Sequence, residues 1–321
     1  MTSSLHWQQR VGSQRDWVWR GWQTRYTYIR PQELDPLATP LILLHGFGAS
    51  IGHWRHNLEV FSQSHPVYAL DMLGFGATEK AMARYNVGLW VEQVYDFWKA
   101  FIGQPVVLVG NSIGSLVCAA AAAAHPDMVQ GIVMMSLHDP SMRNDAIPAP
   151  LRPAIATIEN LVMSPLVLKT VFKLVRRRSV VRKWVAIAYA NKEAVTDELV
   201  DILTGPAADR GSAQAFYALF KAMTKVEFGP SAKTILSKLD IPMLLIWGQQ
   251  DRMIPPQLFR PSQLLEYNSK LQLVELDNAG HCPHDECPDQ VNQIILDWIK
   301  SWRISKDKSE SVMDEKSVSL P

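Results

Sequence analysis

Short apolar runs of strand length recur along this chain and constrain its fold more than any other feature. The runs are Pro40–His45, Val67–Asp71, Val106–Gly110, Gly131–Ser136, Met243–Gly248 and Leu271–Leu276. Stretches with a helical pattern lie between several of them, including Val87–Ile102 and Ser112–Ala124. Strands that are apolar throughout are typical of a sheet buried on both faces, and their alternation with helices is typical of parallel strands. The sequence therefore predicts an α/β fold with a mostly parallel sheet covered by helices.

The first forty residues follow a different pattern, in which aromatic residues occur among polar ones. The aromatic members are Trp17, Trp19, Trp22, Tyr26 and Tyr28. Such alternation is typical of strands with one exposed face. The Gly21-Trp22 step predicts a hairpin between two of these strands.

A long interval from about residue 140 to about residue 233 shows no strand pattern. It contains five stretches with helical character, Pro150–Met163, Pro165–Val175, Val180–Tyr189, Val195–Leu203 and Ser212–Met223, punctuated by prolines. A helical block between two strands of a sheet predicts a cap or lid at 140–233, inserted into a core formed by 1–139 and 234–300. The polar, charge-mixed residues 301–321 predict a disordered tail.

Composition and cysteine content exclude several classes of protein. Hydrophobic residues make up 47% of the chain and charged residues 20%, which predicts a packed core. The net charge of +1 gives no general attraction to nucleic acid. Cys118, Cys282 and Cys287 are too few and too irregularly spaced for a disulfide framework or a zinc site. No H-E-x-x-H motif occurs, and the His-Cys-Pro-His run at 281–284 is too short for a metal-ligand set, so we predict no metal.

No segment of the sequence predicts a membrane span or a secretory signal. Met1–Trp22 contains no apolar run of the kind that a signal peptide needs. The longest apolar stretch, Val106–Ala124, approaches the length of a membrane span. It includes Gly110, Asn111 and Ser112, so a buried strand, a tight turn and a buried helix explain it better. We expect a protein that is cytoplasmic or peripheral on a membrane.

The strongest local signal for chemistry is the run Gly-Asn-Ser-Ile-Gly at 110–114. It follows an apolar Val-Val-Leu-Val strand and precedes an alanine-rich helix, which is the strand–turn–helix context of a nucleophile elbow. Only small residues fit two positions to either side of the serine in so sharp a turn, and glycine occupies both. Amide donors at the helix N-terminus favour negative charge beside the serine. We predict Ser112 as a nucleophile.

A serine nucleophile needs a base and an acid that orients the base. After this type of elbow the acid comes next along the chain and the histidine last. His281 follows the last predicted strand and a glycine, so we predict it as the general base; its rival His284 follows a proline. Asp251 lies just past the strand Met243–Gly248 and is the predicted acid. Asp139, which follows an earlier strand, stays open as the alternative acid.

Acyl transfer also needs hydrogen-bond donors for the oxyanion of the tetrahedral intermediate. We expect one from the backbone amide of Ile113, directly after the nucleophile. The second is expected from the amide of Phe47, in the His-Gly-Phe-Gly loop at 45–48. His45 is expected to hold this loop through a structural hydrogen bond. Asp71 is expected to anchor backbone rather than to react.

These motifs resemble the α/β-hydrolase superfamily over nearly the whole chain and, within it, the chlorophyll dephytylase family. The resembling segments are residues 17–21, 45–51, 53–55, 71–77, 110–116 and 280–285. Residues 191–192, 197–200 and 205–207 are similar to that family's cap, whereas 217–225 match it less clearly. The resemblance implies an α/β-hydrolase fold with an eight-stranded sheet and a helical cap. Epoxide hydrolases and haloalkane dehalogenases share this fold, but they need a carboxylate at the elbow, so Ser112 disfavours both activities.

The resemblance implies that the chain hydrolyses the phytyl ester of chlorophyll to chlorophyllide and phytol, without a cofactor and with pheophytin as a second substrate. It also implies a location at a photosynthetic, thylakoid membrane. A general carboxylesterase or a carbon–carbon bond hydrolase of small substrates would share every catalytic residue. A non-catalytic binding protein on the same scaffold would usually lack a member of the triad, and none is missing here.

The predicted cap holds more apolar residues than one packed helix face requires, among them Leu166, Val171 and Phe172. Ordinary burial explains these residues as well as a wall for a long prenyl chain does. Residues 150–225 also contain twelve Lys or Arg against six Asp or Glu. An apolar face edged with basic side chains can rest on an anionic membrane surface, so peripheral membrane contact through the cap is a further expectation.

Overall fold

The computed structural model describes residues 6–33, 35, 38–139 and 165–317. The strands among these residues form one eight-stranded sheet. The strands are β1 (Gln14–Trp19), β2 (Trp22–Ile29), β3 (Leu41–Leu44), β4 (Val67–Leu70), β5 (Val106–Asn111), β6 (Val129–Met135), β7 (Met243–Gly248) and β8 (Leu271–Leu276). Their spatial order is β1-β2-β4-β3-β5-β6-β7-β8. β2 is antiparallel to β1 and β4, and every pairing from β4 to β8 is parallel. The predicted α/β fold with a mostly parallel eight-stranded sheet is confirmed.

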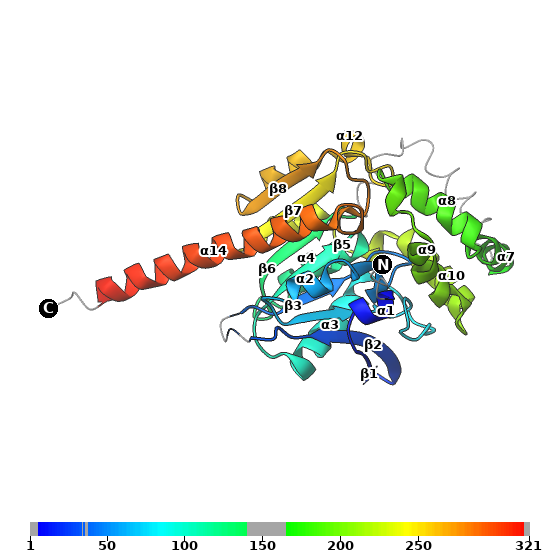
Figure 1. The fold of residues 1–321 in the computed structure, drawn as a ribbon, viewed down its shortest axis with the longest axis horizontal. Coiled ribbons are helices and arrows are strands. Elements are labelled where there is room, and N and C mark those ends of the chain that lie inside the picture. The colour runs from blue at the N-terminus through cyan, green and yellow to red at the C-terminus, as the bar shows by residue number, and fades with distance from the viewer. Residues whose placement is uncertain (1–5, 34, 36–37, 140–164, 318–321) are drawn as a thin grey trace, which may run out of the picture.

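Helices cover both faces of this sheet (Figure 1). The longer core helices are α3 (Val87–Phe101), α4 (Ile113–Ala124) and α14 (Pro288–Ser317). Shorter ones are α1 (Trp7–Arg10), η1 (Ile51–Trp54), α2 (Leu58–Phe61), α11 (Ala232–Leu236), α12 (Pro256–Phe259), η6 (Pro261–Tyr267) and α13 (Pro283–Glu286). α3 packs beside α4, and α2 packs beside α14.

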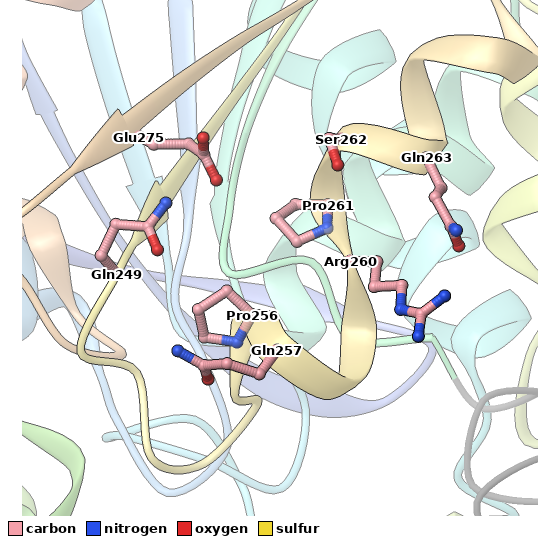
Figure 2. A pocket seen from close by; sticks show the side chains of 8 residues that line it. All are labelled: Gln249, Pro256, Gln257, Arg260, Pro261, Ser262, Gln263 and Glu275. Carbon is pink, nitrogen blue, oxygen red and sulfur yellow. The ribbon is translucent and has the colours of Figure 1, made fainter.

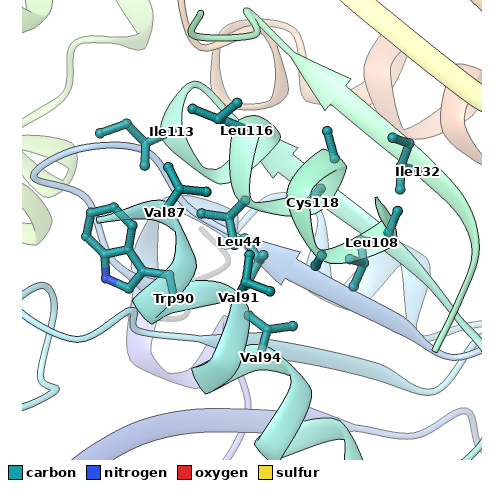
Figure 3. Packing of buried hydrophobic residues seen from close by; sticks show 14 of the residues in the cluster. Leu44, Val87, Trp90, Val91, Val94, Leu108, Ile113, Leu116, Cys118 and Ile132 are labelled. Carbon is teal, nitrogen blue, oxygen red and sulfur yellow. The ribbon is translucent and has the colours of Figure 1, made fainter. Parts of the chain in front are cut away.

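Successive residues of the central strands pack into two separate apolar clusters, one on each face of the sheet. Ile42 and Leu44 of β3 join the cluster that includes α3 and α4 (Figure 3), whereas Leu41 and Leu43 join the cluster that includes α2 and α14. Neighbouring side chains of a strand point to opposite faces. All four side chains are 0% exposed, so the continuous Leu-Ile-Leu-Leu run reflects burial on both sides of the sheet.

The N-terminal hairpin predicted at Gly21 is confirmed. Trp19 of β1 pairs with Trp22 of β2, which leaves a two-residue turn. Both turn residues have positive φ, 51° at Arg20 and 86° at Gly21. Two such residues form the turn whose twist matches that of the flanking strands.

Between β6 and α11 the described chain is helical. The elements are α7 (Pro165–Val175), α8 (Arg178–Ala188), η3 (Lys192–Ala194), α9 (Asp197–Thr204), η4 (Gly205–Ala208), α10 (Ser212–Met223) and η5 (Val226–Phe228). Four predicted helices lie within two residues of these bounds, and the predicted helix Pro150–Met163 falls outside the described residues. We refer to α7–α10 as the cap helices; they lie together at one side of the core (Figure 1).

The C-terminal segment differs from its prediction, because α14 continues to Ser317 where a disordered tail was expected from residue 301. Its first turns pack on the sheet through Val291, Ile295 and Trp298, and its later turns extend away from the core (Figure 1). Once packing has formed the first turns, each added residue gains a hydrogen bond without a new nucleation cost, so lysine and glutamate can prolong the helix. In the described part of the chain, no helix combines the length and apolar character of a membrane span.

Candidate active site

Ser112 occupies a sharp turn between β5 and α4. Its backbone has φ 55° and ψ −115°, a conformation that costs energy for a residue with a side chain and is common at functional sites. A Cβ atom at Gly110 would lie 2.4 Å from the Gly114 carbonyl carbon, and one at Gly114 would lie 2.2 Å from the Leu44 oxygen. Both distances are shorter than real contacts. The predicted elbow is therefore present, and both glycines are required by backbone contact.

The structure brings Asp251 and His281 together. Asp251 Oδ2 accepts a hydrogen bond of 2.9 Å from His281 Nδ1, while Asp251 Oδ1 accepts from the amides of Met253 and Ile254, each at 2.8 Å. The carboxylate of Asp251 is buried and held by backbone donors. Because a carboxylate can only accept here, the proton of the neutral ring lies on Nδ1 and Nε2 is left as the basic nitrogen.

The two rival residues lie elsewhere. Asp139 accepts a hydrogen bond of 3.1 Å from the amide of Ala232 at the start of α11, not from His281. His284 is fully buried, and neither of its ring nitrogens bonds to another described residue. Its ring packs against Trp54, with 4.3 Å between ring centroids. The arrangement of hydrogen bonds therefore favours Asp251 and His281 over Asp139 and His284.

Asn111 fastens the loop of His281 to the elbow. Its Nδ2 donates to the carbonyl oxygen of His281 at 3.0 Å. Among the hydrogen bonds of the described residues, none joins Ser112 Oγ directly to the imidazole of His281. In proteins without substrate such catalytic hydrogen bonds are often long and tighten only in the reacting complex. Sequence reasoning passed over Asn111, although its place beside the predicted nucleophile was a usable signal.

The loop at 45–48 lies against the elbow. A Cβ atom added at Gly46 would lie 3.4 Å from Ser112 Cβ, so the backbone of this loop passes close to Ser112. The backbone amides of Phe47 and Ile113 donate to no other described residue. Two unengaged amides beside a serine are what an oxyanion hole requires.

His45 holds this loop as expected. Its Nδ1 donates to the Gly46 carbonyl at 2.8 Å, and its Nε2 accepts from the Met72 amide at 3.1 Å. Full burial lowers the pKa of His45 to about 4, so the ring is neutral at pH 7. The ring therefore joins the ends of β3 and β4 rather than titrating.

Asp71 anchors backbone, which is the role predicted for it. Its carboxylate accepts from the amides of Ile51 at 2.6 Å and Ala77 at 2.7 Å. Burial raises the pKa of Asp71 to about 6, with the two amide donors acting in the opposite direction. Gly76 approaches so closely that a Cβ atom there would lie 2.1 Å from Asp71 Cγ.

Aromatic rings connect the loop at 45–48 to the cap helices. Phe47 lies 6.3 Å from Phe216 of α10, and Phe216 lies 5.2 Å from Phe172 of α7, measured between ring centroids. Phe172 is buried, Val171 is half-buried, and the side chain of Leu166 lies outside the described residues. Sequence reasoning missed Phe216, because its one signal was a Phe-x-x-x-Phe spacing with Phe220 on a helix.

The structure also contains two small cavities. One of about 250 Å³ is lined by Gln249, Pro256, Gln257, Arg260, Pro261, Ser262, Gln263 and Glu275 (Figure 2). The other, about 140 Å³, lies among cap residues that include Phe172 and Lys173. Neither is lined by Ser112, Asp251 or His281. In the described residues no cluster of His, Cys, Asp or Glu has the arrangement of a metal site.

A family comparison matches residues 39–288 to the α/β hydrolase fold. The chain belongs to this family of hydrolases. It is 26% identical to a 2-hydroxymuconate semialdehyde hydrolase of Pseudomonas sp. (strain CF600), over 81% of this chain and 86% of that protein. It is 25% identical to the chloroplastic pheophytinase of Arabidopsis thaliana, over 83% of this α/β hydrolase but only 62% of the pheophytinase.

Solved structures show the same fold. A bacterial membrane phospholipase A, described as a virulence factor, superposes with a TM-score of 0.71 at 25% identity, over 92% of this chain and 89% of that one. A serine hydrolase involved in carbazole degradation gives a TM-score of 0.71 at 21% identity, over 90% and 98% of the two chains. The α/β-hydrolase fold expected from the sequence is thereby confirmed.

Acid is expected to destabilise this hydrolase through its buried histidines. Burial lowers the pKa of His45 and His138 to about 4, and the pKa values of His53 and His284 lie well below the usual value. The contribution of such a histidine to the free energy of unfolding is fully present above pH 6.5. It is lost as the pH falls toward the pKa of the folded state, because the unfolded chain then binds more protons than the folded one. The raised pKa of Asp71 has the opposite effect between about pH 3.8 and 6, because there the folded state binds more protons than the unfolded one. It therefore reduces the net slope of unfolding free energy against pH.

His284→Leu should flatten the fall of the unfolding free energy as the pH drops from 6.5 to 4.5, because the unfolded variant no longer gains a proton at this position. Urea unfolding at several pH values measures this. His6→Leu, at an exposed histidine, is the matched control and should keep the wild-type slope. Equal slopes in wild type and His284→Leu would contradict the assignment of acid sensitivity to this ring.

Proposed function

We propose that this α/β hydrolase is a serine hydrolase that cleaves a carboxylic ester. The observation that carries the proposal is the 2.9 Å hydrogen bond from His281 to Asp251, on a loop that Asn111 holds against the elbow of Ser112. A histidine oriented by a buried carboxylate beside a strained serine is the arrangement that activates a hydroxyl group for attack.

In the proposed reaction, Ser112 Oγ attacks the ester carbonyl carbon while His281 Nε2 accepts its proton. The amides of Phe47 and Ile113 donate to the oxyanion that forms. His281 then gives the proton to the leaving alcohol, and an acyl-enzyme remains. Water deprotonated by the same imidazole attacks the acyl carbon, releases the acid and restores the hydroxyl of Ser112. Asp251 stays ionised throughout and stabilises the imidazolium.

The phytyl ester of chlorophyll is the proposed substrate, with pheophytin as a second one. Two observations support this choice. The motifs resemble the chlorophyll dephytylase family, and a pheophytinase is among the relatives at 25% identity. The rings of Phe47, Phe216 and Phe172 also form an apolar path from the oxyanion loop into the cap, as a long prenyl chain would require.

Carbon–carbon bond hydrolysis of a small substrate is the competing function. Similarity to the 2-hydroxymuconate semialdehyde hydrolase, at 26% identity, favours it. Both reactions use the same nucleophile and base, so substrate preference separates them. A strong preference for short substrates over chlorophyll would support the competing function.

Purified protein incubated with chlorophyll a should release chlorophyllide and phytol, separated by chromatography. Ser112→Ala should lower the rate by at least about 10³-fold, because the nucleophile is lost while oxyanion donors remain. Circular dichroism should show the wild-type fold in this variant. Reaction of wild type, but not of Ser112→Ala, with a fluorophosphonate probe tests the nucleophile independently of substrate. Chlorophyll turnover by Ser112→Ala at the wild-type rate would reject the site.

Phe216→Ala should shift substrate preference away from long chains. Removing the ring that joins Phe47 to Phe172 interrupts the apolar path, so kcat/KM for phytyl acetate, whose long chain lies in the alcohol, should fall about tenfold or more. Butyl acetate should be affected less than threefold, since its short alcohol does not reach the cap. Losses of this size are those expected for several lost methylene contacts. Lys221→Ala, at an exposed residue of the same helix, is the control. An equal loss for both esters would argue against the path.

Contact of α8 with an anionic membrane surface, such as that of the thylakoid, is also proposed. Trp184 and Ile187 are 55% and 46% exposed and lie three residues apart, hence on one helix face. Lys183 is exposed beside them, and Arg177 is exposed at the start of the helix. Arg182 instead pairs with Asp197 of α9, so the charge available to lipid is smaller than the cap sequence indicates.

Vesicles with about a third anionic lipid should therefore bind the protein in a flotation assay, and neutral vesicles should bind it less, because basic side chains near the surface add attraction. Trp184→Ala should reduce the bound fraction several-fold. Met82→Ala, at another strongly exposed apolar residue, should leave binding unchanged. Equal binding of wild type and Trp184→Ala would remove α8 as the contact.

A further inference from the structure

A buried carboxylate holds the loop that carries His281. Glu286, the last residue of α13, accepts from the amide of Gly280 at 3.0 Å through either oxygen and from the amide of Cys282 at 3.1 Å. These two amides belong to the residues immediately before and after His281. The backbone on both sides of the histidine is therefore fixed by one side chain.

The same carboxylate also binds the chain that follows α8 in the cap. Its Oε2 accepts from the amide of Ala190 at 2.6 Å and from that of Asn191 at 3.2 Å. Four backbone donors from two distant segments thus meet at one side chain. Burial raises the pKa of Glu286, and these four amides act against that effect by stabilising the charged form.

Further contacts join these two segments directly. The amide of His281 itself donates to the Ala188 carbonyl at 2.9 Å, and a Cβ atom at Gly280 would lie 2.3 Å from that same oxygen. Beside them, the Tyr189 hydroxyl donates to Asp285 at 2.7 Å. The loop that carries His281 therefore contacts the cap chain at 188–191 as well as the core.

We propose that Glu286 is a positioning residue for His281, which sets the direction of the imidazole and couples it to the cap. This inference rests on the proposed function, since it assigns the base of that reaction. The carboxylate does not touch the reacting atoms. It acts by fixing the peptide groups on both sides of the histidine, so that Nδ1 meets Asp251 while Nε2 stays available to Ser112. A displacement of a catalytic group by about 1 Å can cost about a hundredfold in rate.

Glu286→Ala, Glu286→Gln and the control Glu266→Ala, at an exposed glutamate on η6, test this proposal. With p-nitrophenyl butyrate, kcat of Glu286→Ala should fall about tenfold to a hundredfold while KM changes less than twofold, because substrate binding does not use this residue. Glu286→Gln keeps one acceptor oxygen and should recover part of the loss. The control should match wild type in both constants.

A second variant changes a cap residue whose amide donates to this carboxylate. Ala190 lies ninety-one residues before His281 in sequence, and Ala190→Pro removes one of the amides that donate to Glu286. This variant should also lower kcat with little change in KM. Circular dichroism and the thermal midpoint identify any variant that fails to fold, and Glu286→Gln then carries the test. The downfield proton resonance of the His281–Asp251 hydrogen bond should broaden or shift in Glu286→Gln.

The outcomes separate this inference from the function on which it rests. Wild type that neither hydrolyses esters nor reacts with a fluorophosphonate probe would overturn the proposed function. Reactive wild type with Glu286→Ala of equal kcat, or with parallel changes in kcat and KM, would overturn the positioning role alone. Unchanged kcat in folded Ala190→Pro would overturn the coupling to the cap.

Discussion

The close packing of backbone where α4 begins is the constraint on which the site depends. Gly114 lies against the Leu44 carbonyl and Gly110 lies against Gly114, so no side chain can be added at either glycine without a clash of about 2.2–2.4 Å. This packing drives Ser112 into a strained conformation and holds its side chain at the end of β5. Because Leu44 and Gly110 are register partners in adjacent parallel strands, the loop at 45–48 that follows β3 lies beside Ser112 for the same reason.

Buried polar groups orient the loops that meet beside Ser112. His45 joins the ends of β3 and β4, Asp71 gathers two loop amides, and Asp251 accepts from its own loop and from His281. Apolar packing has no direction, whereas a hydrogen bond from a buried donor is costly to leave unmade and so fixes an orientation. In this hydrolase the apolar clusters position the strands, and buried hydrogen bonds position the residues beyond their ends.

Most of the core was predictable because its signals are local. The run at 41–44 is apolar at every position, since β3 is buried on both faces, and the serine between two glycines follows a strand and precedes a helix. Residues 301–317, predicted as part of a disordered tail, are helical, because packing of Ile295 and Trp298 starts a helix that the polar residues prolong. The aromatic path through Phe216 and the contacts of Glu286 were not predicted, since each joins segments far apart in sequence without any periodic pattern.

The sequence by itself determined the α/β class, the order of strands and helices, and the candidates for nucleophile, base and acid, because periodicity and tight glycine turns are properties of neighbouring residues. Only the tertiary structure shows that Asp251 accepts a hydrogen bond from His281 whereas Asp139 accepts one from Ala232, since both aspartates follow strands in the sequence. It alone also showed that the histidine loop lies against the cap. Such contacts form where loops at the shared edge of parallel strands come together, and no local sequence pattern predicts the distance between those loops.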